Sequence, residues 1–412
     1  MKVFQLNHSD IKGGAARAAY RIHHALRESG VDSTFLANIA MAGDWTVHAP
    51  TSKAGKAWSL IRPQLGGLVT SLLNTSNPII HSPSILVSGR ERMLNASDAD
   101  LLHMHWVQDE MLSIADIGRL EKPVVWTLHD MWAFCGAEHY TEEFRWRKGY
   151  QKNNRPDYES GFDLNRWTWE RKFKHWRRPM HIVTPSRWLE KCVRESVLMR
   201  DWPVNVVHNP IDTERWQPLE KNLARDLLGL PKDVPLLLFG AIGGSQDPRK
   251  GFDLLLGALQ YLRGELKGME LVVFGQSRPK DLPNLGFHIH YTGYLFDDLS
   301  LRSLYSAVDV FVLPSRQDNL PNTGIESMAC GTPVVAFDAC GLPDIVTHQE
   351  TGYLARPFDM EDLATGISWL LQNANLSKLR AKVRATAVDR FSYPVVAAQY
   401  HKIYQAVRDE RV

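Results

Sequence analysis

The chain has 412 residues, of which 44% are hydrophobic and 23% are charged, and its formal net charge is only +2. This length suggests two or three domains. The composition excludes a disordered or collagen-like chain, and the near-neutral charge gives no reason to expect a nucleic-acid partner. The four cysteines are scattered without a C-x-x-C pair, so a disulfide framework or zinc knuckle is not expected. No signal-peptide core and no apolar run near the roughly 18 residues of a membrane span are visible, so we expect a cytoplasmic protein.

Short β-branched runs alternate with helical patterns along the chain, which indicates parallel sheets flanked by helices. Residues 40–95 give no clear pattern, and we expect loops and an extra helix there. A polar, proline-marked join near 209–218 separates two similar halves. We predict an α/β protein with two tandem Rossmann-like, doubly wound domains facing a central cleft: 1–210, with the final helix 390–412 packing back on it, and 211–389. The predicted strands are 2–7, 33–37, 100–106, 123–128, 181–185, 204–209, 236–240, 270–275, 288–293, 310–314 and 334–338. The predicted helices are 15–29, 187–195, 252–262, 300–307, 323–329, 360–372 and 395–407.

The segment 145–178 is the one anomaly of composition, with eleven Lys or Arg against four Asp or Glu. It also holds four tryptophans, and basic residues interleaved with indole rings suit an anionic membrane surface or a phosphate-bearing ligand. The alternative interpretation is a solvated helix face with the indoles packed inward. The tryptophans are Trp146, Trp167, Trp169 and Trp176.

In the first half, polar motifs follow three predicted strands. Gly13 and Gly14 come after the first strand and open a helix, where backbone N–H groups attract anions, although a simple tight turn is an equal interpretation. His103 and His105 share one face of a strand, and we favour a polar cleft wall over a metal site there. His129 ends an apolar strand, where it is placed to hydrogen-bond a substrate hydroxyl, or to serve a structural role.

In the second half, a glycine-containing loop after residue 240 leads to Arg249 and Lys250 at the start of a helix. Adjacent cations there suit a diphosphate leaving group. The most specific motif is 314–333, in which a strand, a polar loop with Asp318, and a helix with Glu326 one turn in follow each other. Both carboxylates can accept hydrogen bonds from ribose or sugar hydroxyls.

With these motifs the chain resembles a family 4 retaining glycosyltransferase of the two-Rossmann GT-B architecture, and it is similar to bacterial exopolysaccharide and lipopolysaccharide transferases. The resemblance implies that Glu326 holds the ribose, Asp318 the donor sugar and Lys250 the diphosphate, with His129 at the reaction centre. It implies no metal and no cofactor besides the donor substrate. The further donor-binding candidates are Gly13, Gly14, Arg249, Asn319, Leu320, Pro321, Asn322 and Thr323. The acceptor-side candidates are His105 and Trp132.

Three departures from the family pattern stand out. Asp318 replaces the usual Glu, position 244 is Gly where an Arg is common, and Cys135 stands where some relatives carry a cysteine cluster. Arg249 is the natural substitute for the missing cation, and we predict no zinc.

The resemblance implies transfer of a hexose, with UDP-glucose the expected donor, to a lipid-linked or polysaccharide acceptor at the inner face of the membrane, with peripheral contact through 145–178. The alternatives are an epimerase or phosphorylase on the same fold, or a non-catalytic glycan-binding protein.

Overall fold

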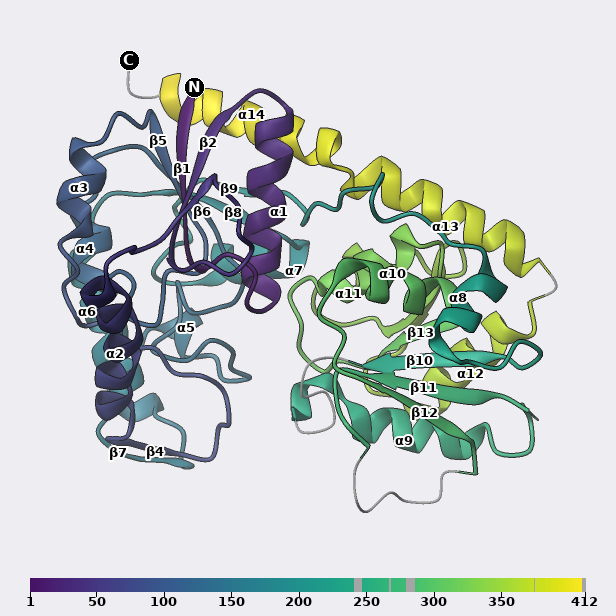
Figure 1. Ribbon diagram of the computed structural model, residues 1–412. Coiled ribbons are helices and arrows are strands. Elements are labelled where there is room, and N and C mark those ends of the chain that lie inside the picture. The colour runs from purple at the N-terminus through teal and green to yellow at the C-terminus, as the bar shows by residue number, and fades with distance from the viewer. Residues whose placement is uncertain (241–246, 267, 279–285, 374, 410–412) are drawn as a thin grey trace. The chain divides into compact units, whose positions relative to one another are not determined.

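The computed structural model describes residues 1–240, 247–266, 268–278, 286–373 and 375–409, and the chain divides into two compact units (Figure 1). Unit 1 comprises Met1–Asn209 and Val396–Val412, and unit 2 comprises Pro210–Val395. The boundary predicted after residue 210 lies beside the observed one. The acceptor and donor roles given to the two domains stay predictions.

Unit 1 is built on a seven-stranded parallel sheet in the order β3-β2-β1-β5-β6-β8-β9. The order reverses beside β1, and in such sheets ligands bind outside the carboxyl ends of the strands at this switch point. The strands are β1 Lys2–Ser9, β2 Asp32–Ile39, β3 Val47–His48, β5 Leu101–Met104, β6 Val124–Thr127, β8 His181–Thr184 and β9 Val204–Val206. A separate antiparallel pair joins β4 Leu73–Thr75 to β7 Glu159–Gly161.

Apolar side chains cover both faces of this sheet. One cluster includes Leu102, Trp126 and Ile182, and the other packs Val3 and Val125 against the last helix. That helix, yellow in Figure 1, is α14 Tyr393–Asp409, and it buries Tyr400 and Tyr404 in unit 1. The other helices of unit 1 are α1 Gly14–Glu28, α2 Lys53–Thr70, α3 Arg90–Ala96, α4 Ile114–Gly118, α5 Arg145–Lys148, η1 Lys152–Asn154, α6 Leu164–His175 and α7 Arg187–Glu195.

Unit 2 repeats the design with a six-stranded parallel sheet in the order β12-β11-β10-β13-β14-β15. Its central strands are wholly buried because helices cover both faces, which explains their continuous apolar runs. The strands are β10 Leu236–Gly240, β11 Glu270–Phe274, β12 Ile289–Gly293, β13 Val310–Leu313, β14 Val334–Phe337 and β15 Gly352–Ala355. The helices are α8 Lys221–Leu228, η2 Pro248–Lys250, α9 Phe252–Tyr261, α10 Asp298–Ala307, α11 Asn322–Ala329, η3 Leu342–Asp344, α12 Met360–Leu371 and α13 Leu376–Phe391.

Among the described residues, no helix combines the length and the apolar character that crossing a bilayer would require.

Candidate active site

The carboxyl ends of β5 and β6 in unit 1 bring two histidines together. His105 Nδ1 lies 3.2 Å from His129 Nε2, and the rings stack with centroids 5.4 Å apart. His105 is only 1% exposed, whereas His129 is partly exposed beyond the end of β6. Burial lowers the pKa of His129 to about 4, against an opposing effect of Asp130. His129 is therefore neutral near pH 7 and suited to hydrogen bonding rather than to strong base catalysis.

Behind this pair a buried chain of polar groups fixes the rings. His105 Nε2 lies 2.7 Å from Gln5 Oε1, so the orientation of His105 is set from β1. His103 contacts Tyr404 at 2.6 Å and Thr127 at 2.7 Å, and Thr127 in turn contacts Tyr400 at 2.9 Å. Burial holds the pKa values of His103 and His105 well below their ordinary range. His105, predicted on the acceptor side, is thus too deeply buried to line an open surface and instead positions His129.

The residue after His129 anchors the following loop. Asp130 accepts hydrogen bonds from Trp106 Nε1 at 3.0 Å and from the Trp132 backbone N–H at 2.9 Å, and it lies 2.6 Å from His139 Nδ1. Burial opposes ionisation, yet His139 and these donors lower the pKa of Asp130. The carboxylate therefore stays charged and holds the loop beside His129.

Trp132 is a core residue, which corrects its prediction as an acceptor-side residue. Its side chain is 0% exposed, and its Nε1 donates to the Ser82 carbonyl at 2.8 Å. The ammonium of Lys172 lies 3.7 Å from the centre of its ring and donates to the carbonyls of Trp132, Cys135 and Gly136. A cation held this way fixes the loop after Asp130 rather than contacting a substrate.

Gly13 and Gly14 lie at the start of α1, as predicted, and both are exposed. Gly13 has φ 96°, a left-handed conformation that favours glycine. The loop before it is anchored by Asp10, which accepts hydrogen bonds from the backbone N–H groups of Met41 and Ala42, both at 2.7 Å. The loop conformation therefore suits close approach of a ligand to the backbone.

In unit 2 the switch point lies between β10 and β13, and Lys250 and Asp318 meet in the chain segments that follow these two strands. Lys250 Nζ lies 2.6 Å from Asp318 Oδ2, and both side chains are partly exposed. The Asp318 carbonyl accepts from the Gly341 N–H at 3.1 Å, which attaches the segment after β14 to the Asp318 loop. Gly251 follows Lys250 with φ 65°, and a Cβ there would lie 1.9 Å from the Pro314 carbonyl oxygen, so only glycine fits.

Arg249 contacts its own loop. Its NH2 lies 2.7 Å from Asp247 Oδ2, and its carbonyl accepts from the Arg316 N–H at 2.7 Å. Arg316 also pairs with Asp253, which ties α9 to the loop after β13. Sequence reasoning missed this clamp because the two partners are distant in sequence. The glycine at position 244 lies outside the described residues.

The loop from Asp318 leads directly into α11. Asn319 and Leu320 are buried, whereas Pro321, Asn322 and Thr323 are partly exposed at the helix start. The N-cap residue of α11, Pro321, makes no side-chain cap hydrogen bond, and the N-terminus of a helix favours anions. Glu326 is only 3% exposed, and it accepts a hydrogen bond from Tyr305 OH at 3.2 Å. The structure thus places the predicted donor residues on one connected loop and helix, and their roles stay predictions.

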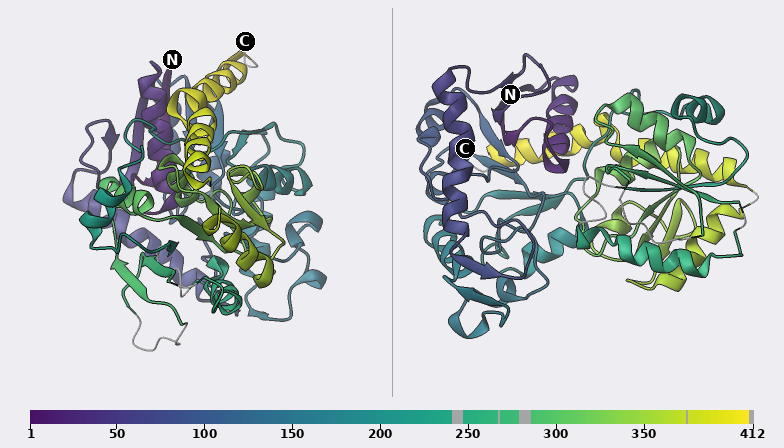
Figure 2. Two further views of the ribbon diagram at one scale, coloured as in Figure 1. Left: turned by 90° about the vertical axis from the view of Figure 1, so that its right-hand side faces the viewer. Right: turned by 60° about the horizontal axis from the view of Figure 1, so that its bottom comes forward.

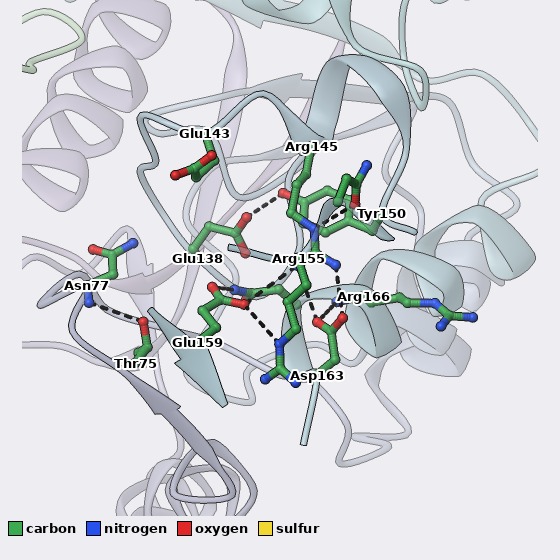
Figure 3. Close-up of polar contacts among 12 residues, drawn as sticks. Thr75, Asn77, Glu138, Glu143, Arg145, Tyr150, Arg155, Glu159, Asp163 and Arg166 are labelled. Atoms are coloured by element: carbon green, nitrogen blue, oxygen red, sulfur yellow. Dashed lines mark hydrogen bonds and ion pairs between the residues drawn. The ribbon is translucent and has the colours of Figure 1, made fainter. Parts of the chain in front are cut away.

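Three of the four tryptophans of the basic segment 145–178 turn inward, so they do not lie on the predicted membrane surface, and membrane contact through this segment stays a prediction. Trp146, Trp169 and Trp176 are 3%, 9% and 5% exposed. Figure 3 shows that Arg145 and Arg155 also point into a polar cluster, where Arg145 pairs with Asp163 at 2.9 Å and with Glu159 at 3.6 Å. These contacts commit Arg145 to the interior of unit 1, whereas other basic residues of the segment, such as Lys148 and Lys174, are exposed.

Helix α2 shows the reverse arrangement, which sequence analysis missed. Its buried residues are Ser59, Arg62 and Gly66, and the Arg62 guanidinium donates to the Glu110 carbonyl at 2.7 Å. The outward apolar residues recur every three or four positions, and Figures 1 and 2 show α2 on the outside of unit 1. We call these residues the α2 apolar face: Trp58 50%, Ile61 47%, Leu65 36%, Leu68 67% and Leu72 56% exposed.

Family models match both units of the chain. The model described as Glycosyltransferase Family 4 matches residues 12–215, and the model described as Glycosyl transferases group 1 matches residues 236–373. Together these matches include every candidate site residue named above except those of β1 and α14.

Curated relatives match in part. D-inositol 3-phosphate glycosyltransferase 2 of Catenulispora acidiphila is 30% identical over 50% of this chain and 52% of its own length. Phosphatidyl-myo-inositol mannosyltransferase of Mycobacterium leprae is 30% identical over 45% of this chain and 50% of its own length. The chain therefore spans about half the length of these relatives.

Solved structures match over nearly the whole chain. Sucrose-phosphate synthase from Thermosynechococcus elongatus has a TM-score of 0.65 at 17% identity, covering 99% of both chains. HepE of Anabaena, solved in complex with UDP-glucose, has a TM-score of 0.66 at 16% identity, covering 98% of this chain and 100% of its own. The fold is the GT-B fold of two parallel-sheet α/β domains.

Proposed function

Because this chain belongs to glycosyltransferase family 4, we propose that it transfers a hexosyl group, with retention, from a nucleoside diphosphate sugar to a glycan or lipid-linked acceptor. The observation that carries the proposal is the Lys250–Asp318 contact of 2.6 Å beside the switch point of unit 2. This contact places the Lys250 cation, which suits a diphosphate, beside the Asp318 carboxylate, which suits sugar hydroxyls. The loop that holds Asp318 continues into α11.

In this proposal Lys250 neutralises charge on the departing diphosphate, and the start of α11 near Thr323 adds backbone dipoles. Arg249 is the second candidate cation on the same turn. Asp318, partly exposed, accepts hydrogen bonds from the donor sugar, and Glu326 accepts them from the ribose. Its existing bond to Tyr305 fixes the Glu326 carboxylate before the donor binds.

The proposed reaction is a front-face displacement. The bond from the anomeric carbon to the phosphate oxygen breaks, the acceptor oxygen bonds on the same face, and the acceptor proton passes to the leaving phosphate. Catalysis then depends on positioning and on charge stabilisation at the leaving group. His129, neutral at pH 7, orients the donor sugar or the acceptor by hydrogen bonding.

UDP-glucose is the proposed donor, supported by the UDP-glucose complex of HepE, whose fold this chain shares. The mannosyltransferase among the partial relatives makes a mannosyl donor the alternative to test. The experiment is thermal stabilisation of the full chain by UDP, GDP, ADP and CMP, each with and without its sugar. At about 100 times Kd, one ligand should add about 2.7 kcal/mol to stability.

Two variants and a control decide whether the predicted site binds the nucleotide. Lys250→Ala and Glu326→Gln should lose the stabilisation, whereas Lys232→Ala, which removes only a surface pair with Asp226, should retain it. Equal stabilisation of all variants would contradict the assigned site. The absence of stabilisation by any nucleotide would favour the non-catalytic interpretation.

We further propose that unit 1 contacts an anionic membrane through the α2 apolar face, in place of segment 145–178. Burial of Arg62 and Gly66 fixes the apolar residues outward. Residues 45–90 contain no Asp or Glu, and Lys53 and Lys56 stand exposed on the first turn of the helix. An apolar face whose own chain segment holds lysines and no acidic residue matches the interface of an anionic bilayer, where a lipid-linked acceptor would be presented.

The test is co-flotation with vesicles of phosphatidylcholine containing phosphatidylglycerol, compared with pure phosphatidylcholine. The variant Ile61→Ser/Leu65→Ser/Leu68→Ser should lose flotation. The control Leu223→Ser/Leu227→Ser removes two exposed leucines of α8 and should float like the unmodified chain. Retained flotation of the triple variant would contradict the proposal, and concentration-dependent self-association abolished by it would show that a second copy covers the face.

A further inference from the structure

A cluster of three metal-ligating side chains lies at the edge of the sheet in unit 2. Glu270 begins β11, His288 immediately precedes the edge strand β12, and His290 lies within it. One ligand atom from each lies within 4.8 Å of those of the other two, and His290 Nε2 is 2.5 Å from Glu270 Oε2. Among the described residues this is the one group of three such side chains that meets this condition.

Strand geometry explains why the three converge. Parallel pairing places His290 opposite Val272 and Ile289 opposite Leu271, and the Leu271 N–H donates to the His288 carbonyl at 2.9 Å. His288 and His290 are two positions apart, and Glu270 is two positions before Val272, so all three project from one face of the sheet. The backbone pairing of β11 with β12 therefore fixes the positions from which the three side chains project.

We propose that Glu270, His288 and His290 bind a divalent metal ion of the zinc class. Two imidazoles and one carboxylate are a ligand set that Zn²⁺ accepts, with water completing the tetrahedron. Zinc–ligand bonds of about 2.1 Å require ligand atoms roughly 3.3 Å apart. Side-chain rotation alone supplies this adjustment, since His290 and Glu270 already touch and His288 is exposed.

The position indicates a structural rather than a catalytic ion. Glu270 lies at the amino end of β11, and the Lys250–Asp318 contact follows the carboxyl ends of β10 and β13. A metal here cross-links the edge strand to its neighbour and covers part of an edge that is otherwise open to pairing. The sequence predicts no metal, so a zinc ion at this edge would correct that prediction. Such a structural ion does not depend on the proposed transferase activity.

The experiment is isothermal titration of the chelator-stripped full chain with ZnCl₂, together with thermal unfolding. The unmodified chain should bind one equivalent and unfold at a higher temperature with Zn²⁺. The single variants His288→Asn and His290→Asn should each weaken binding at least about tenfold, the effect that even outer-shell partners can have. Cobalt(II) added in place of zinc should give visible absorption bands of a tetrahedral site.

His48→Asn is the matched control, because His48 is an exposed histidine on β3, the edge strand of the other sheet. It should bind zinc like the unmodified chain. Glu270→Gln keeps the side-chain shape and separates loss of a ligand from misfolding, and it should also weaken binding. Unchanged zinc binding by the variants, or no saturable binding by the unmodified chain, would overturn the proposal.

Discussion

Two strands of this protein carry the same His-x-His pattern in opposite environments. His103 lies on β5, an interior strand of the unit 1 sheet, His105 directly follows that strand, and the two are 0% and 1% exposed. His288 and His290 lie at β12, an edge strand, where they remain exposed or partly exposed. On β5 every ring nitrogen has a protein partner, whereas at β12 the two rings and Glu270 face one another.

The difference teaches that position in the sheet, rather than the motif, decides what such histidines do. On an interior strand, burial keeps the histidine rings neutral. Their hydrogen bonds hold the rings in fixed orientations, and His105 thereby positions His129. On an edge strand the same spacing leaves ligand atoms accessible to an ion from solvent.

The largest expected effect comes from His129, the residue that the buried polar groups position. His129→Ala should lower the rate of sugar transfer about 100-fold, since it removes the ring that orients the donor sugar or the acceptor by hydrogen bonding. His290→Ala should leave the rate unchanged. Steady-state transfer assays with UDP-glucose or the donor found by thermal stabilisation measure both. Equal rates for His129→Ala and the unmodified chain would remove His129 from the site.

The next effect concerns stability. His103→Leu leaves Tyr404 and Thr127 with a lost buried partner each, so the free energy of unfolding should fall by about 2–4 kcal/mol. His290→Leu, at the sheet edge, should change it by no more than about 0.5 kcal/mol in metal-free buffer. Urea unfolding of both variants gives the comparison, and similar losses would mean that the two strands are energetically alike.

Much of the fold could be predicted because buried parallel strands have a simple signature. Apolar runs such as 310–314 and 334–338 marked β13 and β14 within one residue, and the motifs placed Lys250 and Asp318 in the segments that follow β10 and β13. Such inferences need only strand order and the rule that ligands gather at carboxyl ends.

What could not be predicted depends on long-range contacts. The sequence around Trp58, Ile61 and Leu65 did not show which face of α2 is buried. That choice comes from Arg62 and its bond to Glu110, 48 residues away. Likewise the basic composition of 145–178 did not reveal that Arg145 faces Asp163 and Glu159. The pairing of β4 with β7 joins segments with no local signal for each other.

A smaller effect appears in the pH dependence of stability. Burial holds the pKa of His105 well below its ordinary value of about 6.5, so below that pH the unfolded chain binds a proton that the folded chain does not. The contribution is fully present above pH 6.5 and is lost as pH falls toward the folded pKa. His105→Gln should therefore reduce the slope of unfolding free energy between pH 6 and 5 by about 1.4 kcal/mol per pH unit. Urea unfolding at pH 7, 6 and 5 measures it, and parallel slopes would contradict the burial argument.

The smallest effect comes from removing one hydroxyl, that of Tyr404, from the buried polar groups. Tyr404 OH lies 2.6 Å from His103 Nδ1 and 3.4 Å from Gln5 Nε2, so α14 contributes directly to the polar chain behind His129. Tyr404→Phe keeps the ring packing and should cost about 1 kcal/mol of unfolding free energy. Tyr294→Phe removes a hydroxyl from a 49% exposed tyrosine and should cost nothing measurable. If the buried polar groups behind His129 position its ring, Tyr404→Phe should also lower the transfer rate at saturating donor. The nucleotide-induced stabilisation of unit 2 should stay unchanged. If Tyr404→Phe lowers the stability but leaves the transfer rate unchanged, α14 contributes only to the packing of unit 1. The buried histidines His103 and His105 would then have no effect on the reaction.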